Sequence, residues 1–309
     1  MNIKSISFFV MFFSSFSLLS ETSLYGKLWI SIEHQEKSMG SESELVSNAS
    51  RIGLKGNLDL GNELTAIYQL EYEVDPINGT ADETKEISLK QRNSFIGLKG
   101  FYGTLFMGTH DTAFKKSQKK IDIFNDLSGD IKNILLGENR MKDFIGFKTP
   151  KSKNGFSATF NAIKGSKNLV KNKVGDYLSY SLNYEGNNYY AAVAIDADAK
   201  GYDSTRYSFH LPMDIYTFGV IYQESKKINS NKTESGFAIS ALRKIGSKGE
   251  IKIQLAESDM KLSEGKQFSL GYDYNLSKQF KLFFFLSDLS TLNVIKEKKV
   301  TAFGFEFKF

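Results

Sequence analysis

The sequence predicts an all-β protein, a sixteen-stranded antiparallel β-barrel that spans a membrane. Three observations support this prediction. The last residues alternate between aromatic side chains and small or charged ones, with Phe at every odd position from Phe303 to Phe309. The connections between the expected strands alternate between short and long. The chain begins with an apolar segment that is too short to cross a bilayer as a helix.

The C-terminal segment, 301–309, reads as a strand with two different faces. Successive side chains of a strand point to opposite sides, so one face is aromatic and the other is small or charged. A soluble sandwich could bury the aromatic face in a core. In a membrane barrel that face meets lipid and the polar face meets a watery lumen. Barrel closure also gives this last strand a second partner.

The N-terminal residues 1–20 have the composition of a secretory signal. Lys4 precedes an apolar run from Ile6 to Leu19 that only Ser interrupts. We expect cleavage near Ser20, which leaves 21–309 as one barrel domain. No later apolar run is long enough for a helical span.

The strands of this domain follow from alternation and from turn residues. The first runs over 24–33 and precedes a polar loop at 34–48. The tight turn Asp59–Asn62 separates the second strand from the third, because Asp, Gly and Asn tolerate tight hairpin conformations. The remaining expected strands follow the same pattern. The expected second to sixteenth strands lie at 49–58, 63–74, 92–100, 104–109, 142–149, 155–163, 176–185, 188–196, 203–211, 214–223, 235–244, 249–256, 267–275, 279–287 and 301–309.

The connections sort into two sets along the chain. The short ones lie at 60–62, 101–103, 150–154, 186–187, 212–213, 245–248 and 276–278. The long ones lie at 34–48, 75–90, 110–141, 164–175, 197–202, 224–234, 257–266 and 288–300. Short periplasmic turns at one rim and long external loops at the other are typical of outer-membrane barrels. A soluble sandwich has no reason to sort its loops in this way.

Composition excludes several functional classes. The chain has no Cys, which excludes disulfides, thiol catalysis and Cys-based metal sites. Its three His are far apart, so we expect no metal site and no cofactor. The pairings Ser208-Phe209-His210 and His110-Asp111 have no third partner in the sequence, so we expect no enzyme.

The charges do not indicate nucleic-acid binding. The formal charge is +5 with a pI near 8.9, but the charges are interspersed and form no basic arm. Removing Lys4 with the signal leaves a small positive excess on the mature chain. This positive excess predicts a mild preference for anions as the permeating ions.

Several segments resemble the general porins of the neisserial and related betaproteobacterial type. Leu24–Leu28 is similar to the start of the mature proteins, and the terminal Phe309 fits the family. The other similar segments cover the second hairpin, the fourth and fifth strands, and the exit of the third loop. They are Ser50–Gly56, Asp59–Leu64, Ala66–Glu71, Arg92–Gly100, Gly103–Leu105, Gly108, Glu138–Arg140 and Phe144–Pro150.

The resemblance implies a homotrimeric barrel in the outer membrane of a Gram-negative bacterium, surrounded by lipid. It implies passive diffusion of ions and small hydrophilic solutes, and a third loop folded into the lumen. The connection 110–141 is the longest, which agrees. The family usually has a basic residue soon after the Gly at 108, where this chain has Thr109 and His110.

A narrow polar pore selects by its diameter and by the charges that line it. We therefore expect loop carboxylates to face basic side chains across the lumen. Arg51, Lys55 and Lys99 lie on the face opposite the apolar one. The candidate carboxylates and bases that line the constriction are Asp122, Asp126, Asp130, Glu138, Arg51, Lys55, Lys99, Arg92 and Arg140. The alternative is that the loop carboxylates are only solvated charges.

Two other functions fit a membrane barrel. A substrate-specific channel would need an aromatic track along the lumen, and the inward set of Tyr25, Trp29 and Phe95 is small for that. A structural or adhesive barrel would act through its polar loops. A general pore passes solutes linearly with concentration, a specific channel saturates, and a structural barrel conducts little.

Overall fold

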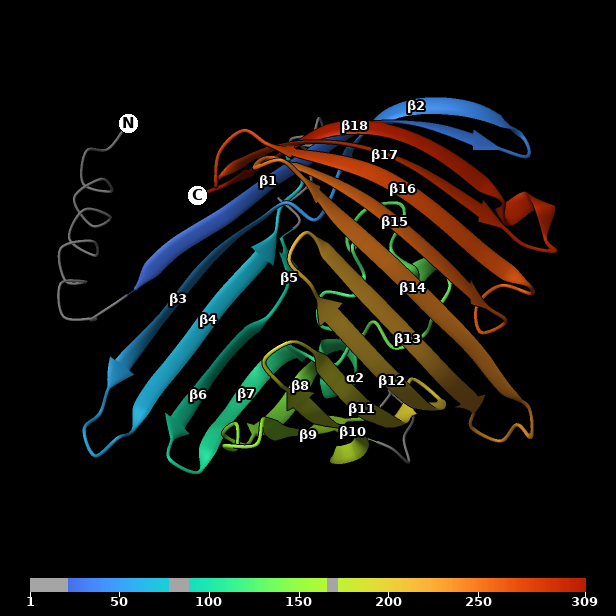
Figure 1. The fold of residues 1–309 in the computed structure, drawn as a ribbon. Helices are drawn as coiled ribbons and strands as arrows, with labels where there is room; N and C mark the ends of the chain where they lie inside the picture. Colours follow the sequence, from blue (N-terminus) through green and yellow to red (C-terminus); the bar gives the residue numbers. More distant parts are fainter. Residues whose placement is uncertain (1–21, 78–88, 166–171) are drawn as a thin grey trace, which may run out of the picture.

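The computed structural model describes residues 22–77, 89–165 and 172–309 of the chain. The expected signal segment at 1–20 lies outside these residues. The strands form one antiparallel sheet of 18 strands, which closes because β1 (Ser23–Lys37) pairs with β18 (Lys298–Lys308) along eleven register pairs (Figure 1). The backbone of Phe309 adds two hydrogen bonds to Gly26, 3.0 and 3.2 Å long, next to this seam.

The other strands follow one another around the barrel in chain order. They are β2 Gly40–Ser47, β3 Arg51–Asp59, β4 Thr65–Glu73, β5 Lys90–Gln91, β6 Ser94–Gly100, β7 Gly103–Asp111, β8 Arg140–Lys148, β9 Phe156–Lys164, β10 Val174–Glu185, β11 Tyr190–Ala199, β12 Tyr202–Pro212, β13 Tyr216–Lys227, β14 Thr233–Ile245, β15 Gly249–Ser258, β16 Gly265–Asn275 and β17 Phe280–Ser290. The described residues also form the short helix α2 Ala113–Lys116 and the 3₁₀ turns η2 Ile131–Asn133 and η3 Val294–Lys296.

Two pairs of these strands are single barrel strands with a local break. β2 and β3 both pair with β1, and Asn48–Ser50 interrupts them at Ala49, whose φ is 53°. β5 and β6 both pair with β4, and Arg92 and Asn93 lie between them. With each pair counted once, the barrel has the sixteen strands that the sequence predicts.

The largest error in the predicted strands is the polar loop at 34–48, which is wrong. β1 continues to Lys37 and forms a tight hairpin with β2, whose first residue, Gly40, lies opposite Lys37. The hairpin is polar and solvent-exposed, and Met39 at its turn is 89% exposed. Ladder hydrogen bonds hold this hairpin without an apolar face, so the hydrophobic pattern does not mark it.

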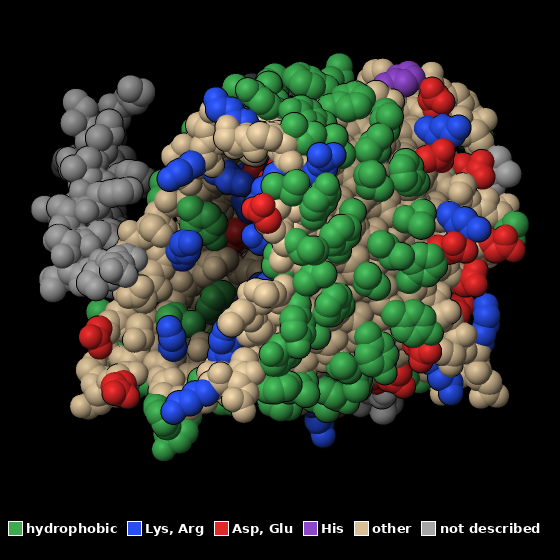
Figure 2. Space-filling view, in the orientation of Figure 1, with side chains coloured by type: hydrophobic (Ala, Val, Ile, Leu, Met, Phe, Trp, Pro, Cys, Tyr) green, Lys and Arg blue, Asp and Glu red, His purple; other side chains and the backbone are tan. Residues whose placement is uncertain are grey.

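The outer surface of the barrel is apolar and the inner surface is polar. In β18, Phe303, Phe305 and Phe307 are 39–47% exposed on the outside, while Ala302 and Glu306 are buried on the inside. Figure 2 shows hydrophobic side chains as a broad area over the strands. An apolar outer band is the surface that lipid covers in membrane barrels. Within the described residues, no helix is both long and apolar enough for a membrane crossing.

The connection between β7 and β8, residues 112–139, folds into the barrel and is called the lumen loop below. Its Ile121, Ile131 and Leu135 pack against Ile221 and other inward residues in one buried cluster. Its Phe124 and Leu127 pack against Phe283, Phe285 and Val300 in another. Part of the barrel interior is therefore filled by this loop.

Candidate functional site

The lumen loop leaves a cavity of about 670 Å³ between its tip and the inner wall near the barrel seam. Lys27 and Trp29 of β1, Arg51 of β3 and Glu306 of β18 line it, and Lys120 and Asp126 line it from the loop. Figure 2 shows a hollow whose walls carry several Lys and Arg side chains. This cavity is the candidate passage through the barrel.

Asp126 is the loop carboxylate that faces bases across the passage. Its Oδ2 lies 3.5 Å from an Arg51 guanidinium nitrogen and 3.9 Å from one of Arg92. The Arg51 and Asp126 side chains are 18% and 19% exposed, so solvent reaches both. The structure thus brings together Asp126, Arg51 and Arg92.

Arg92 and Arg140 are also held by carboxylates of the wall itself. Arg92 contacts Glu71 and Glu73 at 2.8 Å each. Arg140 lies 3.1 Å from Asp111 and donates to the Asn93 side chain at 2.8 Å. Arg140 therefore sits opposite Asp111 of β7 rather than opposite one of the predicted loop carboxylates. Each of these carboxylates orients an arginine on the inner wall.

Lys55 and Lys99 are exposed on the inward-facing side of their strands, but the structure does not place them against the loop carboxylates. Lys55 Nζ lies 5.1 Å from the centre of the Tyr25 ring. Lys99 lies opposite Thr65 and Thr104, close to the turns of β3–β4 and β6–β7. Among the described residues, neither makes an ion pair. Contrary to the prediction, the structure does not pair these two lysines with the loop carboxylates.

Asp122 and Asp130 hold the fold of the lumen loop instead of facing the wall. Asp130 is 1% exposed and accepts hydrogen bonds from the backbone N–H groups of Lys132 and Asp126 at 2.7 and 2.8 Å. Asp122 borders the cavity but is 7% exposed, and it accepts from the Gln254 amide at 3.1 Å. A buried carboxylate that accepts hydrogen bonds from several N–H groups stabilises the local structure and has little contact with permeating ions.

Glu138 is likewise buried, and it binds the loop to the opposite wall. It lies 3.1 Å from Arg206 of β12, whose side chain is fully buried. Arg206 also donates to the Leu136 carbonyl at 2.9 Å and to the Gln223 side chain at 2.8 and 3.0 Å. This group anchors the end of the loop. Neither Arg206 nor Gln223 was found from the sequence.

Burial also affects the charge that these loop groups carry. Burial raises the pKa of Asp122 well above its usual range, and the nearby Asp130 and Glu138 carboxylates raise it further. Burial raises the pKa of Glu138 too, against the opposing effect of Arg206 and Lys115. These two groups therefore contribute less negative charge to the lumen than their number suggests.

A second row of charges, missed by the sequence analysis, continues the wall through the seam. Asp273 lies 2.8 Å from Lys252 and 2.9 Å from Lys281. Glu306 lies 2.6 Å from Lys308, 3.6 Å from Lys281 and 4.0 Å from Lys27. The alternation of β1 could have identified Lys27, because it shares a face with the inward Tyr25 and Trp29.

The described residues contain no group of three or more His, Cys, Asp or Glu arranged to hold a metal ion.

A model of the Gram-negative porin family matches residues 7–291.

The chain belongs to the Gram-negative porin family.

Relatives of this porin include proteins of the type that the sequence resembles. It is 24% identical over 319 residues to outer membrane porin protein 32 of Delftia acidovorans, covering 94% of this chain and 88% of that protein. It is 36% identical over 106 residues to the major outer membrane protein P.IB of Neisseria meningitidis serogroup B, covering 31% of this chain and 30% of that protein.

Solved structures show the same fold. The anion-selective porin from Comamonas acidovorans superposes with a TM-score of 0.77 at 21% identity, covering 94% of this chain and 99% of that one. Salmonella typhi OmpF gives a TM-score of 0.75 at 16% identity, covering 93% and 97%. The protein is therefore an outer-membrane channel for passive diffusion, and it is not an enzyme.

Proposed function

We propose that ions and small hydrophilic solutes cross this porin between the tip of the lumen loop and the inner wall near the seam, with anions favoured over cations. The wall meant here consists of Lys27, Arg51, Arg92, Arg140 and Lys281 and is called the basic wall below. In this proposal Asp126 is the loop carboxylate that faces the passage.

The observation that carries the proposal is that single carboxylates near the basic wall each lie close to two or more basic side chains. Asp126 lies near both Arg51 and Arg92, and Asp273 near both Lys252 and Lys281. Glu306 is shared by three lysines. The lining of the passage also contains four basic side chains and three carboxylates: Lys27, Arg51, Lys120 and Lys308 against Asp122, Asp126 and Glu306.

This excess acts at short range. Charges in a narrow lumen with low-dielectric walls are screened less than charges on an open surface. A local positive potential attracts anions and repels cations, while the width of the passage sets the upper size of the solute. The described residues near the passage form no long aromatic track, which favours a general pore over a sugar-specific one. The anion-selective porin from Comamonas acidovorans has the same fold, and this similarity supports the proposal.

We further propose that residues 1–20 direct export and are removed, and that the mature barrel is a homotrimer. Vibrio cholerae OmpT, which shares the fold at a TM-score of 0.66 and 11% identity over 94% of this chain and 99% of its own, was solved as a trimer. Mass spectrometry of protein purified from outer membranes tests the cleavage near Ser20. Cross-linking in the same membranes tests the trimer.

The selectivity is tested by the reversal potential of the refolded porin in a planar bilayer with a potassium chloride gradient. We expect a sign that reports preferred chloride passage, and current steps that grow linearly with salt. A cation-selective reversal potential would contradict the proposal. Saturating current that one solute class blocks would indicate a specific channel, and absence of conductance from folded protein would indicate a structural barrel.

A further inference from the structure

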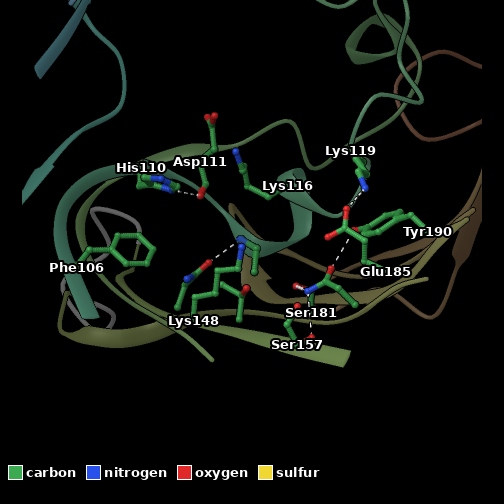
Figure 3. A pocket seen from close by; sticks show the side chains of 14 residues that line it. Phe106, His110, Asp111, Lys116, Lys119, Lys148, Ser157, Ser181, Glu185 and Tyr190 are labelled. Carbon is green, nitrogen blue, oxygen red and sulfur yellow. Dashed lines mark hydrogen bonds and ion pairs between the residues drawn. The ribbon is translucent and has the colours of Figure 1, made fainter. Parts of the chain in front are cut away.

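A second cavity, of about 220 Å³, is lined by β7–β11 and the lumen loop, whereas β1, β3 and β18 line the passage. Figure 3 shows this second cavity from close by. Its floor is the inner face of β8–β11, and its roof is the first part of the lumen loop. Lys116 and Lys119 line it from the loop, and Lys148 lines it from the end of β8. The passage and this cavity share no lining residue.

The floor of this cavity is made of hydroxyl and amide groups. Ser157, Thr159 and Asn161 follow one another on the inward face of β9. Ser181 of β10 lies opposite Thr159, and Lys148 of β8 lies opposite Thr159 on the other side. Strand register therefore places an ammonium group next to a polar row that can donate hydrogen bonds.

Asn161 has a buried donor without a partner. Its side chain is 4% exposed, and its Oδ1 accepts from the Ala113 backbone N–H at 2.6 Å. That bond fixes the orientation of the amide, since only the oxygen can accept. The Nδ2 group is left without a hydrogen-bond partner in the described protein, although Asn161 lines the cavity. An unpaired buried donor is costly, so it marks a place where an acceptor belongs.

The charges of the cavity favour an anionic acceptor. Its two carboxylates are both occupied: Asp111 by Lys115 and Arg140 at 3.5 and 3.1 Å, and Glu185 by Lys119. Lys116 and Lys148 make no ion pair with any residue that the structure describes. Two ammonium groups and one N–H donor thus remain available around one space.

We propose that this cavity is a binding site for a small oxyanion, of the kind that phosphate or a carboxylate group presents. Asn161 Nδ2 donates one hydrogen bond to it, and Lys116 and Lys148 neutralise its charge. Bonds between charged donors and oxyanions are short and strong compared with neutral ones. The site holds an anion away from the passage, and it is independent of the proposed anion preference at Arg51.

Crystals of the porin soaked in sodium selenate test the position of this site. We expect a selenium anomalous peak within hydrogen-bonding reach of Asn161 Nδ2, between Lys116 and Lys148. A cavity that contains only water, with selenate bound elsewhere or nowhere, would overturn the proposal. The reversal potential in chloride is a separate result, so the site and the proposed selectivity can fail independently.

Variants test the contacts through the selenate concentration at which the selenium anomalous peak at this site reaches half of its full height. Asn161→Asp keeps the acceptor for the Ala113 N–H but replaces the donor with an anion, and we expect at least about a tenfold higher selenate concentration. Lys148→Gln, at an exposed position, should also raise this selenate concentration. The matched control is Lys153→Gln in the neighbouring turn, outside the cavity, and it leaves the selenate response unchanged. Equal responses in Lys148→Gln, Lys153→Gln and the unmodified porin would contradict the proposal.

Discussion

The two inner walls of this barrel use the same strand pattern for opposite purposes. The wall of β10–β16 contacts the lumen loop mainly through neutral amides, hydroxyls and one fully buried arginine, with the Lys252–Asp273 ion pair on β15 and β16. Ser179, Arg206, Gln223, Gln254 and Gln267 form this anchoring wall, and each hydrogen-bonds the loop. The basic wall instead carries charged side chains, of which Arg51, Arg140 and Lys281 are partly exposed.

The difference shows how one loop creates an asymmetric lumen. Amide and hydroxyl side chains can satisfy loop backbone groups at modest desolvation cost, so the loop binds there. Burying the many cations of the opposite wall under the loop would cost far more unless each was paired. The loop therefore settles on the neutral wall and leaves the charged wall open to water. The following changes test this division, from the largest expected effect to the smallest.

Arg206→Met is expected to disturb the anchoring wall most. It leaves Glu138 buried without its closest cation and removes the bond to the Leu136 carbonyl. Loss of one partner of a buried pair costs about 3–5 kcal/mol, so the free energy of unfolding in detergent should fall by that order. We also expect an unsteady single-channel current, because the loop end is released.

The matched control for this change is the double variant Arg206→Met, Glu138→Gln. It removes the unpaired buried charge and should recover part of the lost stability. A loss below about 1 kcal/mol in the single variant, with a steady current, would show that the loop does not depend on this anchor.

Arg51→Glu is expected to change the basic wall without disturbing the loop. It removes a cation beside Asp126 and places a second carboxylate there. A shift of about 1–2 kcal/mol in the local potential changes the chloride-to-potassium permeability ratio roughly five- to thirtyfold. The reversal potential measures this ratio, and an unchanged value would remove Arg51 from the passage. Arg51→Gln should give a smaller shift in the same direction.

The buried carboxyl of Asp122 makes the stability of the loop depend on pH. Its folded-state pKa is raised by burial and by Asp130 and Glu138, so folding favours the protonated form. This contribution is complete below the unfolded pKa and is lost as pH rises through the folded pKa. Unfolding free energies measured across that range should therefore fall with pH. Asp122→Asn, which stays neutral, should flatten this part of the curve, and identical curves would refute the assignment.

Lys55→Gln and Lys99→Gln are expected to have the smallest effect. Both lysines face inward but lie near the short turns, away from the carboxylates of the loop. Exposed and screened charges contribute little beyond about 10 Å, so the permeability ratio should change less than about twofold. A change as large as that of Arg51→Glu would move the selective region to the turn side of the barrel.

The sequence predicts the barrel well because lipid imposes a strict rule on its outer face. Phe303, Phe305 and Phe307 had to alternate with inward residues, and sixteen strands follow from repeated alternation. The hairpin around Met39 was missed because a strand outside the apolar band needs no such alternation. Its ladder hydrogen bonds leave no mark in the residue types.

The site was harder to predict because alternation gives the face of a residue but not its neighbours. Arg51 and Asp126 were recognised as opposing charges, and the structure brings them together. Asp130 and Glu138 look like lumen charges in the sequence, yet the path of the loop buries them. Arg206 is a lone arginine in β12, and only the three-dimensional path of the loop reveals its partners.

The central claim is that the lumen loop leaves water on the basic wall and excludes it from the five residues of the anchoring wall that bind the loop. The chain has no Cys, so single cysteines can probe each side without a background. Lys120→Cys places a thiol in the exposed lining of the passage, and Ser179→Cys places one where the side chain is fully buried against the loop. A negatively charged thiosulfonate reagent should quickly reduce the single-channel current of the first variant and leave that of the second unchanged. Rapid block of Ser179→Cys, or none of Lys120→Cys, would contradict this division of the lumen.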